Sequence, residues 1–229
     1  MKENKKDKTY EEYQKVFKNK KYAENYHKNF TSKGGIGLLN PINFFGVNVA
    51  RAEINTVKNL LSLCEGNRIL DAPCGSGKLL PKLLDMNFSV TGADYSDGML
   101  SQIKIKNKNL KLIQADIRKL PFKDKSFDVV ICNRFLHRIP IEQHTETLKE
   151  LYRVSKKYAI IYFGVKGILT DLVIFAERVL KLGDRGKLYY ISKKEIKRLL
   201  YENRWEFIKG KKAIPLISTG YVVLARKLD

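Results

Sequence analysis

The sequence contains few cysteines and no long uncharged hydrophobic run. Its three cysteines, Cys64, Cys74 and Cys132, lie far apart and form no C-x-x-C pair, which argues against a disulfide framework and a zinc ribbon. The most apolar region, 158–176, is interrupted by a lysine and an aspartate and is not a membrane span. The N-terminus is charged and lacks the apolar core of a secretory signal. We therefore expect a cytoplasmic protein, without a transmembrane segment and without a metal site.

Acidic residues are also scarce: 24 acidic residues against 44 basic ones give a net charge of +20. Such an excess ordinarily suggests a polyanionic partner, because phosphate contacts dominate nucleic-acid affinity. Lysine, however, outnumbers arginine by 33 to 11, and arginine is the residue that binds phosphates and bases bidentately. The lysines are spread over 2–33, 104–125 and 187–212. We interpret the charge as a solvated surface. An RNA-binding face is the less favoured alternative, and the charge would also suit an anionic small substrate or peripheral contact with anionic lipid.

The clearest motif is R-I-L-D-A-P-C-G-S-G-K-L-L at 68–80, where a short apolar run ends in Asp71 and opens into a Gly-x-Gly turn. Gly75 and Gly77 let the backbone turn sharply and approach a ligand without an intervening Cβ. We expect a buried strand, the turn, and then a helix from Lys78 whose free N–H groups face the ligand. This arrangement predicts a nucleotide-binding turn.

Polar residues also end three further predicted strands. Asp94 follows F-S-V-T-G-A, Asp116 follows L-K-L-I-Q-A, and Asn133 follows F-D-V-V-I-C. In a βαβ unit, an acid after the second strand can accept hydrogen bonds from the hydroxyls of a ribose. Open α/β sheets bind ligands at the carboxyl edge of their strands. The sequence therefore predicts a ligand that lies across this edge of a parallel sheet.

In their order and spacing, D-A-P-C-G-S-G, D-Y-S-D-G-M-L, A-D-I-R-K-L-P-F and S-F-D-V-V-I-C-N-R-F-L-H resemble the motifs of class I S-adenosylmethionine-dependent methyltransferases. The most similar group includes the ubiquinone/menaquinone and other small-molecule methyltransferases, and the resemblance is strong over Ile69 to His137. Pro73 departs from the family pattern, because it stands where the first loop glycine usually lies and has no N–H to donate. A dinucleotide-binding Rossmann enzyme is the competing interpretation. It fits less well, because no third glycine follows Gly77 at the required spacing.

The resemblance implies an α/β fold with a Rossmann-like, seven-stranded, mostly parallel sheet, helices on both faces and an antiparallel last strand. The chain has the length of one sizeable domain with appendages. We expect an N-terminal helical cap at 1–45 and a methyltransferase core at 46–229. The helical spacing of apolar residues predicts an inserted lid helix after the fifth strand, within about 164–190. Ser192 and Glu195 predict the start of a later helix.

By the same resemblance, the cofactor is S-adenosyl-L-methionine, with S-adenosyl-L-homocysteine as product. The resemblance assigns these residues to the donor: Asp71, Cys74, Gly75 and Gly77 at the methionine end, Asp94 at the ribose, Tyr95 and Met99 beside the adenine, Asp116 and Ile117 at the adenine edge, and Asn133 at the methionine moiety. Tyr26, in the predicted N-terminal helix, would lie over the donor. The alternative is that the tyrosines of this helix only pack against the core.

Methyl transfer from a sulfonium is an in-line displacement, so the enzyme mainly aligns the donor methyl with the acceptor atom and excludes water. His137, just past the fourth strand, is the candidate general base, and a structural histidine is the alternative. The strand end N-R-F-L lacks the Asn/Asp-Pro-Pro-aromatic pattern of enzymes that methylate adenine or glutamine amides. An apolar lid and an aromatic N-terminal helix favour a small, partly hydrophobic acceptor.

Three other functions compete with a small-molecule methyltransferase. The first is an RNA or protein methyltransferase that uses the basic surface, and salt-sensitive retention on RNA together with its methylation would identify it. The second is a catalytically inactive partner protein, which would bind donor tightly without turnover. The third is an aminopropyltransferase, for which the sequence shows no cluster of pocket carboxylates.

Overall fold

The computed structural model describes residues 10, 14, 15, 18, 21, 23, 24, 41–166, 188–214 and 219–228, with the main chain alone at 41–47. The described positions between 10 and 24 are helical. The predicted lid helix, Tyr26 and most of the predicted cap at 1–45 lie outside the described residues.

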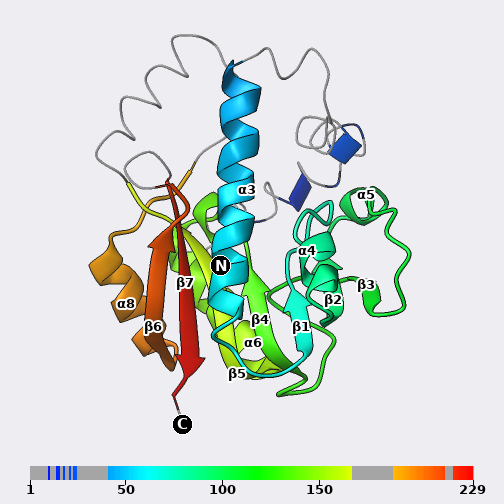
Figure 1. Ribbon diagram of the computed structural model, residues 1–229. Helices are drawn as coiled ribbons and strands as arrows, with labels where there is room; N and C mark the ends of the chain where they lie inside the picture. Colours follow the sequence, from blue (N-terminus) through cyan, green and yellow to red (C-terminus); the bar gives the residue numbers. More distant parts are fainter. Residues whose placement is uncertain are drawn as a thin grey trace, which may run out of the picture.

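Seven strands form the central sheet (Figure 1). They are β1 (Arg68–Asp71), β2 (Ser89–Asp94), β3 (Leu110–Gln114), β4 (Phe127–Cys132), β5 (Ser155–Gly164), β6 (Trp205–Lys212) and β7 (Gly220–Lys227), in the order β3-β2-β1-β4-β5-β7-β6. The strands from β1 to β5 pair in parallel, whereas β7 runs antiparallel to β5 and β6. The predicted fold class, a seven-stranded and mostly parallel sheet with an antiparallel last strand, is confirmed.

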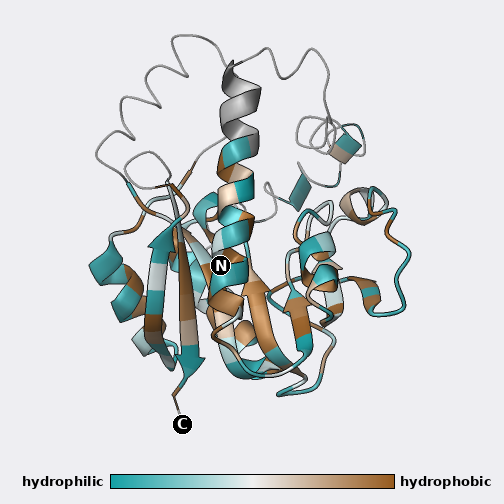
Figure 2. Ribbon diagram, viewed as in Figure 1, coloured by the Kyte–Doolittle hydropathy of each residue, from teal (hydrophilic) through white to brown (hydrophobic). Residues whose placement is uncertain are grey.

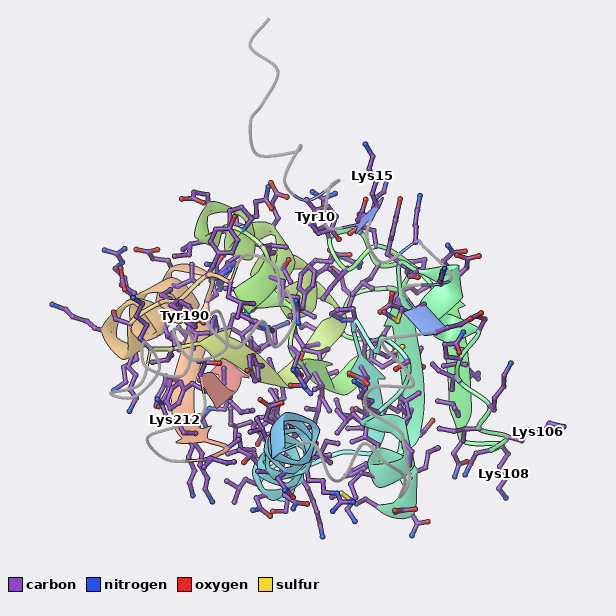
Figure 3. The ribbon with its side chains drawn as sticks, turned by 90° about the horizontal axis from the view of Figure 1, so that it is seen from above. Tyr10, Lys15, Lys106, Lys108, Tyr190 and Lys212 are labelled. Carbon is purple, nitrogen blue, oxygen red and sulfur yellow. The ribbon has the colours of Figure 1, made fainter. Side chains whose placement is uncertain are left out.

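Helices cover both faces of this sheet (Figures 1 and 3). The described helices are α3 (Pro41–Leu61), α4 (Leu80–Asp85), α5 (Asp97–Leu100), α6 (His144–Val154) and α8 (Lys193–Glu202), with the 3₁₀ turns η2 (Leu136–Arg138) and η3 (Ile141–Gln143). Side chains of α6 and α8 share one buried cluster with the sheet, and side chains of α3 and α4 share the other. None of these helices is long and apolar enough to cross a membrane.

The central strands are apolar along both faces, as Figure 2 shows for β1 and β4. In β4, Val130 and Cys132 belong to the cluster under α6, whereas Val129 and Ile131 belong to the cluster under α3. Successive side chains of a strand point to opposite faces, and both faces are covered here, so the strand has a continuous hydrophobic run. The two cores hold the carboxyl ends of β1, β2 and β4 in fixed positions at one edge.

The helix predicted from Lys78 begins two residues later, at Leu80. Gly77 has a φ of 78°, in the left-handed region, which a helix cannot include, and Leu80 N donates to Gly77 O at 3.2 Å to close a turn. Pro81 then occupies the first helical turn, where its missing N–H costs nothing. The short α4 therefore starts behind the glycine turn.

The predicted start of a helix at Ser192 is confirmed as the N-cap of α8. Ser192 Oγ accepts a hydrogen bond from Glu195 N at 3.2 Å, and the Glu195 carboxylate accepts one from Ser192 N at 2.9 Å. These reciprocal bonds satisfy two backbone donors that the helix leaves free.

Candidate functional site

A pocket opens at the carboxyl edge of the parallel strands. Its walls come from the segments that follow β1, β2, β3 and β4 and from two side chains of the N-terminal helical residues, Tyr10 and Gln14. Of the residues predicted to bind donor, the following line it: Asp71, Cys74, Gly75, Asp94, Tyr95, Met99, Ile117 and Asn133. The structure thus brings together side chains from four strand ends.

Three of the predicted site residues do not line this pocket, namely Gly77, Asp116 and His137. A Cβ at Gly77 would lie 2.9 Å from Ile103 Cγ1, so this glycine lets the turn pack closely on the protein interior. Tyr26 lies outside the described residues. The two glycines of the turn therefore have different surroundings.

Gly75 and Asp94 connect the ends of β1 and β2. Gly75 N donates to Asp94 Oδ2 at 2.7 Å, and Ser96 N donates to Oδ1 at 2.9 Å. Gly75 has a φ of 55°, and a Cβ added there would meet no atom within 4 Å. Because Gly75 lines the pocket and faces open space, a ligand can approach the backbone at this point.

The pocket is acidic at this end. Burial raises the pKa of Asp71 to about 8, and the negative charge of Asp94 acts in the same direction. Burial also raises the pKa of Asp94 to about 6, although the hydrogen bonds from Ser96 N and Gly75 N oppose this rise. Two buried carboxyl groups that ionise reluctantly would be stabilised as anions by a cationic or hydroxyl-bearing ligand.

The carboxylate of Asp116 holds the N-terminal helical residues against the core. It accepts hydrogen bonds from Tyr10 Oη at 2.9 Å, from Gln14 Nε2 at 3.2 Å and from Arg118 N at 2.8 Å. Burial acts to raise the pKa of Asp116, but the hydrogen bonds from Arg118 and Tyr10 and the charge of Arg118 outweigh it and lower the pKa below its ordinary value. The guanidinium of Arg118 lies 3.5 Å above the Tyr10 ring, and Phe135 meets the same ring edge-on. Asp116 therefore positions a wall of the pocket.

Two buried polar atoms face the pocket. Ser76 Oγ and Asn133 Oδ1 have no hydrogen-bond partner in the part of the chain that the structure describes, and both residues line the pocket. Buried polar atoms are nearly always hydrogen-bonded in native proteins, so both atoms suit contact with a polar ligand. Ser76 was missing from the sequence prediction. Its place between the two glycines of the turn was the signal that could have found it.

The other end of the pocket is basic, which the sequence did not predict. Lys78, Arg134 and Arg138 line it, and Arg134 Nη1 lies 3.5 Å from Glu53 Oε2 of α3. Burial lowers the pKa of Lys78 to about 6, and the charge of Arg134 contributes to this shift. The pocket therefore combines acidic groups on β1 and β2 with basic groups that come mainly from the segment after β4.

His137 belongs to the interior beside the basic end. Its ring centroid lies 4.9 Å from that of Tyr162 on β5, and 6% of the residue is exposed. Burial lowers the pKa of this imidazole well below its ordinary value, and the charges of Arg138 and Arg134 add to the effect. The ring is therefore neutral at pH 7. No group of three or more His, Cys, Asp or Glu side chains that could hold a metal ion occurs among the described residues.

Residues 70–163 match the family model described as "Methyltransferase domain". The putative methyltransferase YqeM of Bacillus subtilis is 38% identical over 121 residues, which make up 51% of this chain and 49% of that protein. A demethylmenaquinone methyltransferase of Staphylococcus aureus is 35% identical over 146 residues, 60% of this chain and 58% of that protein. The chain thus spans about half the length of the curated relatives it matches.

Solved structures share the fold over most of the chain. Magnesium protoporphyrin IX methyltransferase of Synechocystis PCC 6803, with bound S-adenosylhomocysteine, aligns with a TM-score of 0.74 and 17% identity, over 96% of this chain and 99% of that one. The 1,6-didemethyltoxoflavin-N1-methyltransferase of Burkholderia thailandensis aligns with a TM-score of 0.62 and 14% identity, over 96% of this chain and 90% of that one. Residues 70–163 are therefore similar to a methyltransferase domain, and the chain shares its fold with solved methyltransferase structures.

Proposed function

We propose that the protein is an S-adenosylmethionine-dependent methyltransferase that transfers a methyl group to a small, partly hydrophobic acceptor. The convergence of Asp71, Gly75, Asp94 and Asn133 in one pocket at the carboxyl edge of a methyltransferase domain carries this proposal. Two of the similar proteins are named for demethylmenaquinone and for magnesium protoporphyrin IX, which supports a small-molecule acceptor.

The residues at the acidic end fit the donor. In this proposal the buried carboxyl group of Asp71 lies near the positively charged end of the donor, and Asp94 accepts hydrogen bonds from the ribose hydroxyls. Ser76 Oγ and Asn133 Oδ1 offer the polar atoms that a methionine moiety can satisfy. Tyr95, Met99 and Ile117, which line the same pocket, supply the apolar surface for the adenine ring. This end is the donor site of the proposal.

When bound, the donor supplies an electrophilic methyl group on a sulfonium. The protein's residues then have to orient two ligands and keep water away from the reacting atoms. Tyr10 and Phe135 contribute apolar surface to the pocket wall, which serves the second task. We infer that His137 is structural, because its imidazole packs against Tyr162 and does not line the pocket.

Calorimetric titration with S-adenosylhomocysteine tests the donor site. The parent protein should bind it, and Asp94→Ala should lose measurable binding, because it removes both the proposed ribose contact and the acceptor for Gly75 N. Asp85→Ala, an exposed acid at the end of α4, is the matched control and should bind like the parent. A parent protein that does not bind S-adenosylhomocysteine would contradict the proposed function.

Labelled methyl groups on the donor then distinguish the acceptor classes. We expect transfer to an organic extract of small molecules and none to bulk RNA. The distribution of charge supports the preference for a small molecule over RNA, since Figure 3 shows Lys15, Lys212 and the neighbouring pair Lys106 and Lys108 at separate places around the periphery. Salt-sensitive labelling of RNA would favour the alternative, an RNA methyltransferase.

A further inference from the structure

Three basic side chains lie close together in the pocket wall, at its basic end. Lys78 comes from the segment after β1, Arg134 from the end of β4 and Arg138 from η2, and all three line the pocket. Lys78 Nζ is buried. Glu53, whose carboxylate pairs with Arg134, is itself 2% exposed. The charged forms of Lys78 and Glu53, held so far from water, are favourable only where opposite charges come close to them, whereas the side chain of Arg134 is 25% exposed.

The sheet order separates this basic end from the proposed donor site. Asp94 ends β2 and Asp71 ends β1, whereas Arg134 follows β4, and its partner Glu53 interacts with Tyr162 on β5. From β2 to β5 the edge of the sheet thus changes from acidic to basic. Most of the proposed donor residues follow β3, β2 or β1, and Asn133 follows β4, so we assign the part of the pocket beside Arg134 and Arg138 to a second ligand.

The backbone at Arg134 gives an independent indication of function. Its φ is 56°, in the left-handed region that residues with a Cβ rarely adopt. Such conformations persist where the surrounding structure holds them, and they cluster at ligand-binding sites. Here the conformation occurs in a pocket-lining arginine immediately after Asn133.

We propose that Lys78, Arg134 and Arg138 bind an anionic group of the methyl acceptor, a carboxylate or a phosphate, so that the acceptor is a partly hydrophobic acid. This inference rests on the proposed function. Arginine presents a planar set of donors that matches both anions, and lysine adds a point charge. Burial, together with the like charges of Arg134 and Arg138, lowers the pKa of Lys78, so an entering anion would favour its protonated form.

Binding of a matched acid and amide to the protein saturated with S-adenosylhomocysteine tests the proposal. We choose 2-naphthoate and 2-naphthamide, which have nearly the same shape and differ in charge, and measure both affinities by NMR titration at pH 7. The acid should bind at least tenfold more tightly than the amide. Arg138→Gln should abolish this preference, Arg138→Lys should keep part of it, and Lys119→Gln, at an exposed lysine outside the pocket, should leave it unchanged.

Proton uptake gives a second readout that a merely structural role would not produce. Calorimetry in two buffers of different ionisation enthalpy should show that naphthoate binding takes up a proton, and Lys78→Gln should remove this uptake. Lys78→Gln also tests the acid preference itself, in case Arg138→Gln does not fold.

Two results would overturn the inference. One is equal affinity of acid and amide for the parent protein. The other is a loss of S-adenosylhomocysteine affinity in Arg138→Gln with unchanged affinity for 5′-methylthioadenosine, which lacks the amino-acid carboxylate. The basic end would then hold the donor. Failure of the proposed function is distinguishable, because the parent would then bind no S-adenosylhomocysteine at all.

Discussion

Substitution of the two glycines of the turn should affect different properties, donor affinity at Gly75 and stability at Gly77, and this gives the sharpest test of the site. Both have a left-handed φ, 55° at Gly75 and 78° at Gly77, so an alanine at either position costs about 1–2 kcal/mol of backbone energy. At Gly75 no steric cost adds to this backbone energy, because a Cβ there meets no atom within 4 Å. Gly75→Ala should therefore lower Tm by about 2–8 °C.

At Gly77 the new Cβ would lie 2.9 Å from Ile103 Cγ1 and 3.1 Å from Leu80 Cδ1. Displacing these side chains adds about 1–3 kcal/mol, so Gly77→Ala should cost about 2–5 kcal/mol in all. Thermal unfolding of both variants measures the difference. Gly77→Ala should be clearly the less stable variant.

Donor affinity should follow the opposite order. The methyl group of Gly75→Ala occupies pocket space, so S-adenosylhomocysteine should bind at least tenfold more weakly, a loss of about 1.4 kcal/mol or more. A folded Gly77→Ala protein should bind within about threefold of the parent, because Gly77 does not line the pocket. Parent-like affinity of Gly75→Ala would refute our placement of the donor, and equal stability of the two variants would refute the account of the turn.

Three further predictions concern other described residues. Tyr10→Phe removes a hydrogen bond to Asp116 worth about 1.5–3 kcal/mol, so calorimetry should show S-adenosylhomocysteine binding about tenfold more weakly; unchanged affinity would show that this bond does not shape the pocket. Asp71→Asn should gain stability over the parent as pH rises from 4 to 8, by up to about 1.4 kcal/mol per pH unit, because the folded parent keeps a proton that its unfolded chain releases. Urea unfolding at several pH values measures the difference in stability between variant and parent. Lys78 contributes with the opposite sign, but equally in both proteins, so its contribution cancels in this difference. A difference that stays constant with pH would contradict the raised pKa of Asp71. His137→Asn should lower Tm yet leave the pH–rate profile with an acceptor unchanged between pH 6 and 8; a hundredfold loss of kcat at unchanged donor affinity would instead assign it a catalytic role.

Local patterns were sufficient to predict the first four strands and the polar strand ends that meet at the pocket. Apolar runs that end in Asp71, Asp94 or Asn133 carry both the strand and its polar end in a few consecutive residues. The resemblance to methyltransferases supplied the antiparallel last strand.

Contacts between distant segments could not be predicted in the same way. Tyr10 and Asp116 are 106 positions apart, and a helical aromatic residue gives no sign of which carboxylate it will meet. The basic end is a similar case, since Lys78 and Arg134 are neighbours only because β1 and β4 pair in the sheet. In the sequence their charges do not stand out among 44 lysines and arginines.

The bond between Gly75 N and Asp94 has a consequence for how a ligand is received. It joins the turn after β1 to the end of β2 through protein groups, so the shape of the turn is held without a ligand contact. The entropy lost in ordering this turn is therefore lost when the chain folds and does not reduce the affinity. Such preorganisation predicts fast association with little structural change. In the proposed donor site, the ribose hydroxyls would share Asp94 with a backbone amide.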